Sequence, residues 1–258
     1  MSTFLFDQII FGPVQSRRLG VSLGINLLPT DSKVCSFNCI YCECGWTPRQ
    51  RATKAILPSR ETVAVKLKEQ LQKMQADKQL PDVITFAGNG EPTLHPKFPE
   101  IISDTLAARD QYAPKCKVAV LSNAMRITQK SIFDALLRVD DNILKLDSAI
   151  PETIQKIDCP MGHYHLDKTI ETLCQFGRQA IIQTLFLRGS YQQQLIDNTT
   201  DEEIQAWLNV LQKVNPGQVM IYSLDRDTPA SQLEAVSHEE LEQIASRVRE
   251  LGLSVQVS

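Results

Sequence analysis

Three cysteines crowd one short stretch of the sequence, Cys35-Ser36-Phe37-Asn38-Cys39-Ile40-Tyr41-Cys42. Three residues separate the first two cysteines, and two separate the last two. A loop this short can wrap three thiolates around one iron–sulfur cluster, each on a different iron. Three ligands leave the fourth iron open, and an open iron can bind a small molecule and pass it an electron. The spacing therefore predicts Cys35, Cys39 and Cys42 as ligands of a four-iron cluster.

Two alternatives exist for these cysteines. Buried structural thiols are disfavoured, because free cysteines rarely gather in one polar loop. A zinc site would add Cys44, which lies just beyond the stretch. Zinc sites of this kind usually join two well-separated pairs of ligands, so the spacing favours the cluster over zinc.

The whole chain has the composition of a soluble globular protein, with 258 residues, 43% hydrophobic and 22% charged. It contains no apolar run near the roughly 18 residues that cross a bilayer. The N-terminus lacks the basic lead and cleavage site of a secretion signal. Seven cysteines, three of them clustered, indicate metal in a reducing compartment rather than disulfides. We therefore expect a cytoplasmic protein without a membrane interaction.

The net charge of −3 gives no global attraction to nucleic acid. The first 60 residues, however, hold seven basic residues against three acidic ones, on both sides of the cysteines. The basic residues are Arg17, Arg18, Lys33, Arg49, Arg51, Lys54 and Arg60. This excess is either a solvated surface or an electropositive rim that attracts an anionic substrate or an acidic electron donor.

Strand and helix patterns alternate along the chain, which favours a parallel sheet with helices outside. Strands are expected at 21–28, 83–86, 117–121, 143–146, 180–187 and 218–223, with a short last strand at 254–257. Helices are expected from 60, over 98–109, 129–139 and 166–176, and from 201 and 238, the last two opened by capping boxes at Thr200–Glu203 and Ser237–Glu240. Six such units predict an α/β fold that is a partial (β/α)6 TIM-type barrel, with a doubly wound open sheet as the alternative.

We expect one domain over 1–258. Its parts are an N-terminal hairpin and first strand (1–30), a cluster loop and basic loop (31–58), and the remaining βα units (59–258). The cysteines follow the first strand directly, and α/β barrels carry their chemistry at this end of the strands.

Polar residues also stand where later strands end. Gly88-Asn89-Gly90-Glu91 follows the second strand, and its glycines let backbone approach a ligand closely. Ser122, Asn123 and Asp147 follow the third and fourth strands and can bond hydroxyl groups, although a cap or turn role is equally open to each. Further candidates are Lys145, Gln183, Arg188 and Arg226, although a local ion pair is the alternative for Arg226. His163 and His165 can ligate a metal, but surface histidines in a loop are commoner.

These motifs resemble those of the radical SAM (S-adenosylmethionine) superfamily. The spacing Cys-x3-Cys-x2-Cys, with Tyr41 before the third cysteine, resembles its signature, and Gly88–Glu91 resembles its Gly-Gly-Glu motif with Asn89 inserted. The string Gly-Asn-Gly-Glu-Pro-Thr-Leu is similar to wyosine-type tRNA-modifying members. Those of archaeal type carry further cysteines upstream, whereas Cys35 is the first cysteine here.

The resemblance implies an enzyme with two cofactors, a [4Fe-4S] cluster and S-adenosylmethionine. Reductive cleavage of S-adenosylmethionine would yield a 5′-deoxyadenosyl radical, which takes hydrogen from a substrate. It places the amino group of S-adenosylmethionine at Gly88, Asn89, Gly90 and Glu91, the adenine near Tyr41, and the ribose near Ser122, Asn123 or Asp147. It also implies an electron donor such as flavodoxin or ferredoxin. The substrate stays open between tRNA, a peptide and a small molecule, as does a role in activating a glycyl-radical enzyme.

Overall fold

The computed structural model describes residues 4–16, 18–48 and 56–258. Eight of the strands in these ranges form one sheet, in the order β1-β2-β3-β4-β5-β6-β9-β11. Their bounds are β1 Ile10–Ser16, β2 Gly20–Ile25, β3 Val83–Phe86, β4 Lys117–Ser122, β5 Asp141–Lys145, β6 Ala180–Leu185, β9 Gln218–Tyr222 and β11 Val255–Val257. β1 pairs antiparallel with β2, and every later neighbour is parallel.

From β2 to β11 the strand order follows the chain without reversal. A doubly wound sheet reverses its order at a switch point, whereas a barrel does not. The curled sheet is therefore the predicted partial TIM-type barrel, and the doubly wound alternative is wrong. β11 confirms the expected short last strand.

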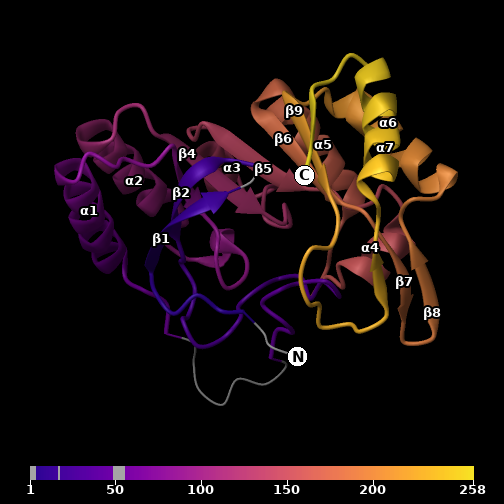
Figure 1. The fold of residues 1–258 in the computed structure, drawn as a ribbon, viewed down its shortest axis with the longest axis horizontal. Coiled ribbons are helices and arrows are strands. Elements are labelled where there is room, and N and C mark those ends of the chain that lie inside the picture. The colour runs from indigo at the N-terminus through magenta and orange to yellow at the C-terminus, as the bar shows by residue number, and fades with distance from the viewer. Residues whose placement is uncertain (1–3, 17, 49–55) are drawn as a thin grey trace.

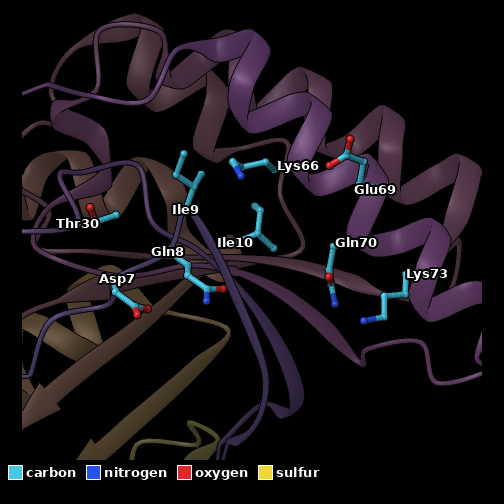
Figure 2. Close-up of a pocket in the computed structure, with 9 residues that line it drawn as sticks. All are labelled: Asp7, Gln8, Ile9, Ile10, Thr30, Lys66, Glu69, Gln70 and Lys73. Carbon is cyan, nitrogen blue, oxygen red and sulfur yellow. The ribbon is translucent and has the colours of Figure 1, made fainter.

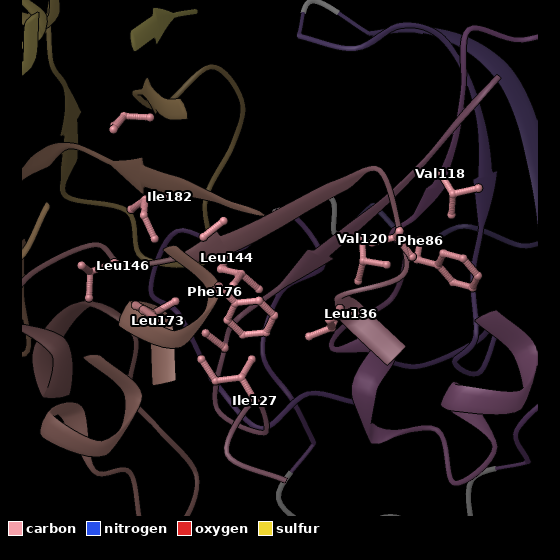
Figure 3. Packing of buried hydrophobic residues seen from close by; sticks show 14 of the residues in the cluster. Phe86, Val118, Val120, Ile127, Leu136, Leu144, Leu146, Leu173, Phe176 and Ile182 are labelled. Carbon is pink, nitrogen blue, oxygen red and sulfur yellow. The ribbon is translucent and has the colours of Figure 1, made fainter. Parts of the chain in front are cut away.

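Helices connect the parallel strands and pack against one face of the sheet, with α1 and α2 toward one end and α6 and α7 toward the other (Figure 1). Their bounds are α1 Arg60–Ala76, α2 Phe98–Tyr112, α3 Lys130–Leu136, α4 Pro151–Ile157, α5 Leu166–Phe176, α6 Asp201–Val214 and α7 His238–Glu250. Figure 3 shows the core between the layers, where Val120 and Leu144 from the strands lie near Leu136 and Phe176 from the helices.

Side-chain caps begin three of these helices. Ser59 accepts a hydrogen bond from the Thr62 amide, and Ser237 forms the predicted reciprocal capping box with Glu240. Of the capping box predicted at Thr200, only the hydrogen bond to the Thr200 side chain is present, and the reciprocal bond to the Glu203 side chain is wrong. Thr200 accepts from the Glu203 amide, but the Glu203 carboxylate accepts from Ser148, at 2.6 Å, and from Thr153. A carboxylate at this position also reaches a neighbouring segment, so the sequence pattern alone does not settle its partner.

A second, three-stranded sheet was not expected. It has the order β10-β7-β8, with β7 Leu187–Tyr191, β8 Gln194–Asp197 and β10 Leu233–Ala235. The predicted strand 180–187 is in fact divided between two strands of different sheets, β6 of the eight-stranded sheet and β7 of the three-stranded sheet, with only Phe186 between them. Because the apolar run is continuous across Phe186, its pattern does not reveal the change of sheet.

Alternate residues of the strands face the interior of the curled sheet. Val83, Ala119, Ile143, Ile181 and Met220 form a small buried cluster there. A separate cluster of buried residues lies past the strand ends and includes Phe37, Cys39, Ile40 and Tyr41. The cysteine loop, Cys35–Cys42, is therefore packed at the carboxyl ends of the strands, where it was predicted.

Candidate functional site

The cysteine loop is fastened on two sides. On one side Val34 pairs with Gly90, where the Val34 amide donates to Asn89 O at 2.8 Å and the Glu91 amide donates to Val34 O at 3.0 Å. On the other side the Asn38 amide donates to Asp158 O at 3.0 Å. These backbone contacts hold the loop between the end of β3 and the end of α4.

The thiols of the loop differ in their surroundings. Burial raises the pKa of Cys35 to about 11 and raises that of Cys39 as well. A hydrogen bond with the Cys44 thiol, helped by the Lys33 ammonium, lowers the pKa of Cys42 to about 5 although the group is buried. Cys42 is therefore the thiol poised as a thiolate at neutral pH, and metal binding must displace the protons of the other two.

Lys33 is a buried cation beside these thiols, although the sequence marked it only as one of the basic residues near the N-terminus. It is 2% exposed, and its Nζ donates to Gly45 O at 2.8 Å. Burial works against its charge, but the nearby Cys42, Cys35 and Cys39 outweigh burial and raise its pKa. Its position two residues before Cys35 was the only signal in the sequence.

The donor set fits a cluster. Three thiols on one loop face a shared neighbourhood, since each acts electrostatically on Lys33 and Cys35 interacts with Cys42. In the described ranges, no three His, Cys, Asp or Glu side chains are placed to hold a single metal ion. Ligands of a [4Fe-4S] cluster bind different irons, so they surround a volume and need not converge on one point. Amide donors near a sulfur are also present, because Phe37 N lies 3.4 Å from Cys35 Sγ.

The Gly88–Glu91 turn brings backbone against this loop. Gly88 and Gly90 have φ angles of +144° and +131°, which favour glycine. A Cβ atom on Gly90 would stand 1.9 Å from the Val34 carbonyl oxygen. The second glycine of the motif is thus required by the contact between the turn and the cysteine loop.

Glu91 joins the turn to the end of β4. Its carboxylate, 2% exposed, accepts from Thr93 N at 3.0 Å and from Ser122 Oγ at 2.9 Å through Oε1. Oε2 accepts from Asn123 N at 2.6 Å. A carboxylate oxygen has two lone pairs, so Oε2 retains one further acceptor position. Burial raises the pKa of Glu91, opposed by these hydrogen bonds.

Asn123 extends this group to the cysteines. Its Nδ2 donates to Ser36 Oγ at 2.9 Å and lies 3.6 Å from Cys35 Sγ. The predicted residues Glu91, Ser122 and Asn123 are therefore brought together beside the first cysteine, although they come from different βα units.

Asn89 has a different environment from the other residues of its turn. Its side chain is fully buried and pairs with the backbone of Phe6, accepting from N at 2.8 Å and donating to O at 2.9 Å. It also donates to Pro29 O at 2.8 Å. Its side-chain amide therefore binds the backbone of Phe6 and Pro29, and the residue fixes the shape of the turn through these contacts.

A buried ionic cluster lies on the other side of the loop. Lys145 Nζ donates to Asp147 Oδ2 at 2.7 Å, to Asp158 Oδ1 at 3.3 Å and to the Tyr41 hydroxyl, which donates in turn to Asp147. Asp158 also accepts from Cys39 Sγ at 3.3 Å. We call Tyr41, Lys145, Asp147 and Asp158 the lysine cluster.

Charges in the lysine cluster compensate one another. Burial disfavours the ammonium of Lys145, but Asp147 and Asp158 outweigh burial and raise its pKa well above the ordinary value. Burial raises the pKa of Asp158 in spite of Lys145. Lys145 is thus a cation held mainly by Asp147, with Asp158 as a second and weaker partner, which explains a lysine at the end of an interior strand. Lys145 and Asp147 were candidates from the sequence, whereas Asp158 was not.

Two cavities lie inside the curled sheet. The mouth cavity, about 370 Å³, is lined by Tyr41, Cys42 and Gly88 among others. The inner cavity, about 170 Å³, is lined by side chains of the strands, including the inward Gln183. A third cavity of about 480 Å³ lies between residues 7–10 and α1, with Lys66 and Lys73 in its wall (Figure 2). None of the described residues predicted to bind a cofactor lines this third cavity.

Other predicted candidates lie outside the site or in ion pairs. Arg188 pairs with Glu240 at 2.8 Å, and Arg226 pairs with Glu43 at 2.7 Å. His163 and His165 lie with ring centroids 6.5 Å apart, and the part of the chain that the structure describes gives them no third ligand. Of the basic rim, Arg17, Arg49, Arg51 and Lys54 lie outside the described residues.

The sequence model of one protein family, the Radical SAM superfamily, matches residues 30–211 of this chain. The chain belongs to the radical SAM superfamily. The matched range contains the cysteine loop, the Gly88–Glu91 turn and the lysine cluster, so the site described above lies within the region of family likeness. The cofactors of radical SAM proteins are a [4Fe-4S] cluster and S-adenosylmethionine, as the sequence predicted.

The chain is also similar to individual proteins. The chain is 31% identical over 252 residues to a protein of Brachyspira hyodysenteriae named GTPase Obg, covering 96% of this chain and 34% of that protein. A radical SAM methyltransferase from Sphaerobacter thermophilus has a TM-score of 0.66 at 12% identity, over 92% of this chain and 65% of the other. The structure of TYW1 with a lysine-pyruvate adduct has a TM-score of 0.58 at 16% identity, over 89% and 73%. These structural likenesses establish the partial barrel fold.

Proposed function

We propose that this protein is a radical SAM enzyme whose cluster is held by Cys35, Cys39 and Cys42. The observation that carries the proposal is the backbone contact between Val34 and Gly90, which docks the cysteine loop against the Gly88–Glu91 turn at the mouth cavity. When bound, the cluster and S-adenosylmethionine together supply a 5′-deoxyadenosyl radical that removes hydrogen from a substrate.

The turn and its neighbours have the groups to hold S-adenosylmethionine. Gly88 presents backbone to the mouth cavity, and Glu91 Oε2 keeps an acceptor position for an ammonium group. Tyr41 lines the same cavity, and Ser122, Asn123 and Asp147 stand at the ends of β4 and β5. Gly90 and Asn89 contribute by fixing the shape of the turn. We assign these eight residues to the cofactor site.

The remaining side chains shield the site. Phe37 and Ile40 of the cysteine loop are 1% and 0% exposed, and they pack with Leu185 and Leu187. This packing covers one side of the cysteine loop and keeps water and stray hydrogen donors from that side, as radical chemistry requires. Residues 1–258 are proposed to act as one domain in this arrangement.

The proposal extends to partners and compartment. Reduction of the cluster requires an electron donor such as flavodoxin or ferredoxin. All seven cysteines are free, which suits a reducing cytoplasm. The described helices include no span that is both long and apolar enough to cross a membrane. The substrate candidates are tRNA, a peptide and a small molecule; tRNA predicts binding that weakens steeply with salt.

Metal analysis of anaerobically reconstituted protein tests the assignment. We expect about four iron and four sulfide per chain, and an electron paramagnetic resonance signal of the reduced protein that changes when S-adenosylmethionine is added. One zinc per chain without iron or sulfide would support the alternative, a zinc-bearing binding module. Iron and sulfide together with an electron paramagnetic resonance signal that does not change on addition of S-adenosylmethionine would support an iron–sulfur module without radical chemistry.

A further inference from the structure

Arg18 forms part of the wall of both the mouth cavity and the inner cavity. Phe6 and Ala87 are the other residues that the two cavities share. A guanidinium at this place lies between the cysteine loop and the apolar interior of the barrel. In the sequence Arg18 stood out only as one of the basic residues near the N-terminus.

The guanidinium of Arg18 is held in place but not satisfied. Its Cζ lies 4.5 Å from the centroid of the Tyr222 ring, which fixes the group by a cation–π contact. Its Nη1 is buried and has no hydrogen-bond partner among the described residues. Burial raises the pKa of Tyr222 to about 12, so the phenol beneath the arginine is neutral and supplies no counter-charge.

Carboxylates near the mouth do not neutralise Arg18. None of the ion pairs between described residues includes it. Glu43, which lines the mouth cavity, is bound to Arg226 at 2.7 Å. Arginine stays protonated, and a buried donor without a partner is costly. A fixed, charged side chain that lines two cavities and has a buried donor without a partner has the properties of a ligand-binding group.

We propose that Arg18 binds an oxyanion of the substrate, a carboxylate or a phosphate, inside the barrel. Both oxyanions accept paired hydrogen bonds from a guanidinium. The inner cavity beside Arg18 is lined mainly by apolar side chains, including Leu19, Ile143 and Met220. The ligand therefore carries an apolar portion next to its anionic group. The inference rests on the proposed function in that it assigns this ligand as the substrate.

Small aromatic anions test the proposal on reconstituted protein with S-adenosylmethionine present. Benzoate probes the carboxylate and phenyl phosphate the phosphate, while benzamide is a neutral match for benzoate. We expect calorimetry to detect binding of at least one of the two anions. If benzoate binds, its affinity should be at least tenfold higher than that of benzamide. The tighter of the two anions identifies the oxyanion. Absence of binding by both anions, or equal binding of benzoate and benzamide when benzoate is the tighter anion, overturns the proposal.

Variants locate the binding group. Arg18→Gln should weaken binding of the anion at least tenfold, because glutamine has no charge and cannot form the paired, charge-assisted hydrogen bonds of a guanidinium. Arg18→Lys should retain part of the affinity for the anion. Tyr222→Leu, which removes the ring under the guanidinium, should lower that affinity a few-fold. Arg226→Gln is the matched control, because Arg226 lines the mouth cavity but already has Glu43. Equal losses in Arg226→Gln and Arg18→Gln would overturn the assignment.

Two further outcomes distinguish a failure of the Arg18 proposal from a failure of the proposed function. If Arg18→Gln lowers the affinity for S-adenosylmethionine and leaves anion binding intact, Arg18 belongs to the cofactor site and the proposal is wrong. Anion binding does not require cleavage of S-adenosylmethionine. A protein that binds the anion at Arg18 but cleaves no cofactor would therefore refute the proposed function and leave the oxyanion site standing as a binding site.

Discussion

Gly90 lies so close to Val34 that a Cβ atom on the glycine would stand 1.9 Å from the Val34 carbonyl oxygen. The atom in the way belongs to backbone, so it cannot be relieved by turning a side chain. The contact is the point at which the Gly88–Glu91 turn meets the cysteine loop.

Gly90→Ala should therefore separate the turn from the loop. We expect a loss of about 3 kcal/mol or more in the free energy of unfolding and a lower iron content after reconstitution. Urea unfolding and iron analysis measure the two effects. Gly252→Ala is the control, because Gly252 also has a positive φ, +76°, but nothing lies within 4 Å of its added Cβ. That variant should lose only about 1 kcal/mol. Equal losses in both would show that the contact has no special role.

Asn89→Asp should be more damaging than its small change in shape suggests. The Asn89 amide donates to Phe6 O and Pro29 O, and a carboxylate would face both carbonyl oxygens without a proton to donate. We expect a destabilisation of about 2–4 kcal/mol, measured by urea unfolding. Asn209→Asp, on an exposed face of α6, provides the comparison. A loss no larger than in Asn209→Asp would contradict the structural role of Asn89.

Lys145→Met should leave two buried carboxylates, Asp147 and Asp158, without their cation. Breaking a buried ion pair in this way costs about 3–5 kcal/mol. The double variant Lys145→Met/Asp158→Asn removes one of the stranded charges and should recover part of the loss. Thermal or urea unfolding of both variants measures the coupling. If the double variant is less stable than Lys145→Met, the charges of the lysine cluster do not compensate as described.

Much of this arrangement could be predicted from the sequence. β3 and α5 have the predicted bounds, because strong apolar periodicity and a following glycine or polar turn mark their ends. The placement of the cysteine loop and of Glu91, Ser122 and Asn123 followed from one rule, that polar residues at the ends of parallel strands share one edge of the sheet.

The rest depends on contacts that no local pattern contains. Asp158 lies 119 residues from the Cys39 thiol that it accepts from, and it stands at the end of α4, a short helix that the periodicity did not predict. Arg18 meets Tyr222 across the barrel. The sheet change at Phe186 is invisible because burial continues on both sides of it. Sequence periodicity reports burial within an element and does not say which distant element provides the burial.

Single cysteine variants should distinguish the three proposed cluster ligands from Cys44, which lies next to them. Cys35→Ala, Cys39→Ala and Cys42→Ala should each lose most of the iron that wild-type protein takes up. Cys44→Ala should keep iron close to the wild-type amount, because Cys44 lies outside the predicted ligand set and its thiol lies 3.5 Å from Gly88 O. Iron and sulfide analysis after anaerobic reconstitution measures the difference. Loss of metal in all four variants would favour the four-cysteine zinc site.

The release of 5′-deoxyadenosine decides whether the cysteine loop supports radical chemistry. Anaerobically reconstituted protein, reduced with dithionite and given S-adenosylmethionine, should release 5′-deoxyadenosine, and Cys39→Ala treated in the same way should release none. A wild-type protein with a full complement of iron and sulfide that leaves S-adenosylmethionine intact would contradict the assignment of this site to radical chemistry.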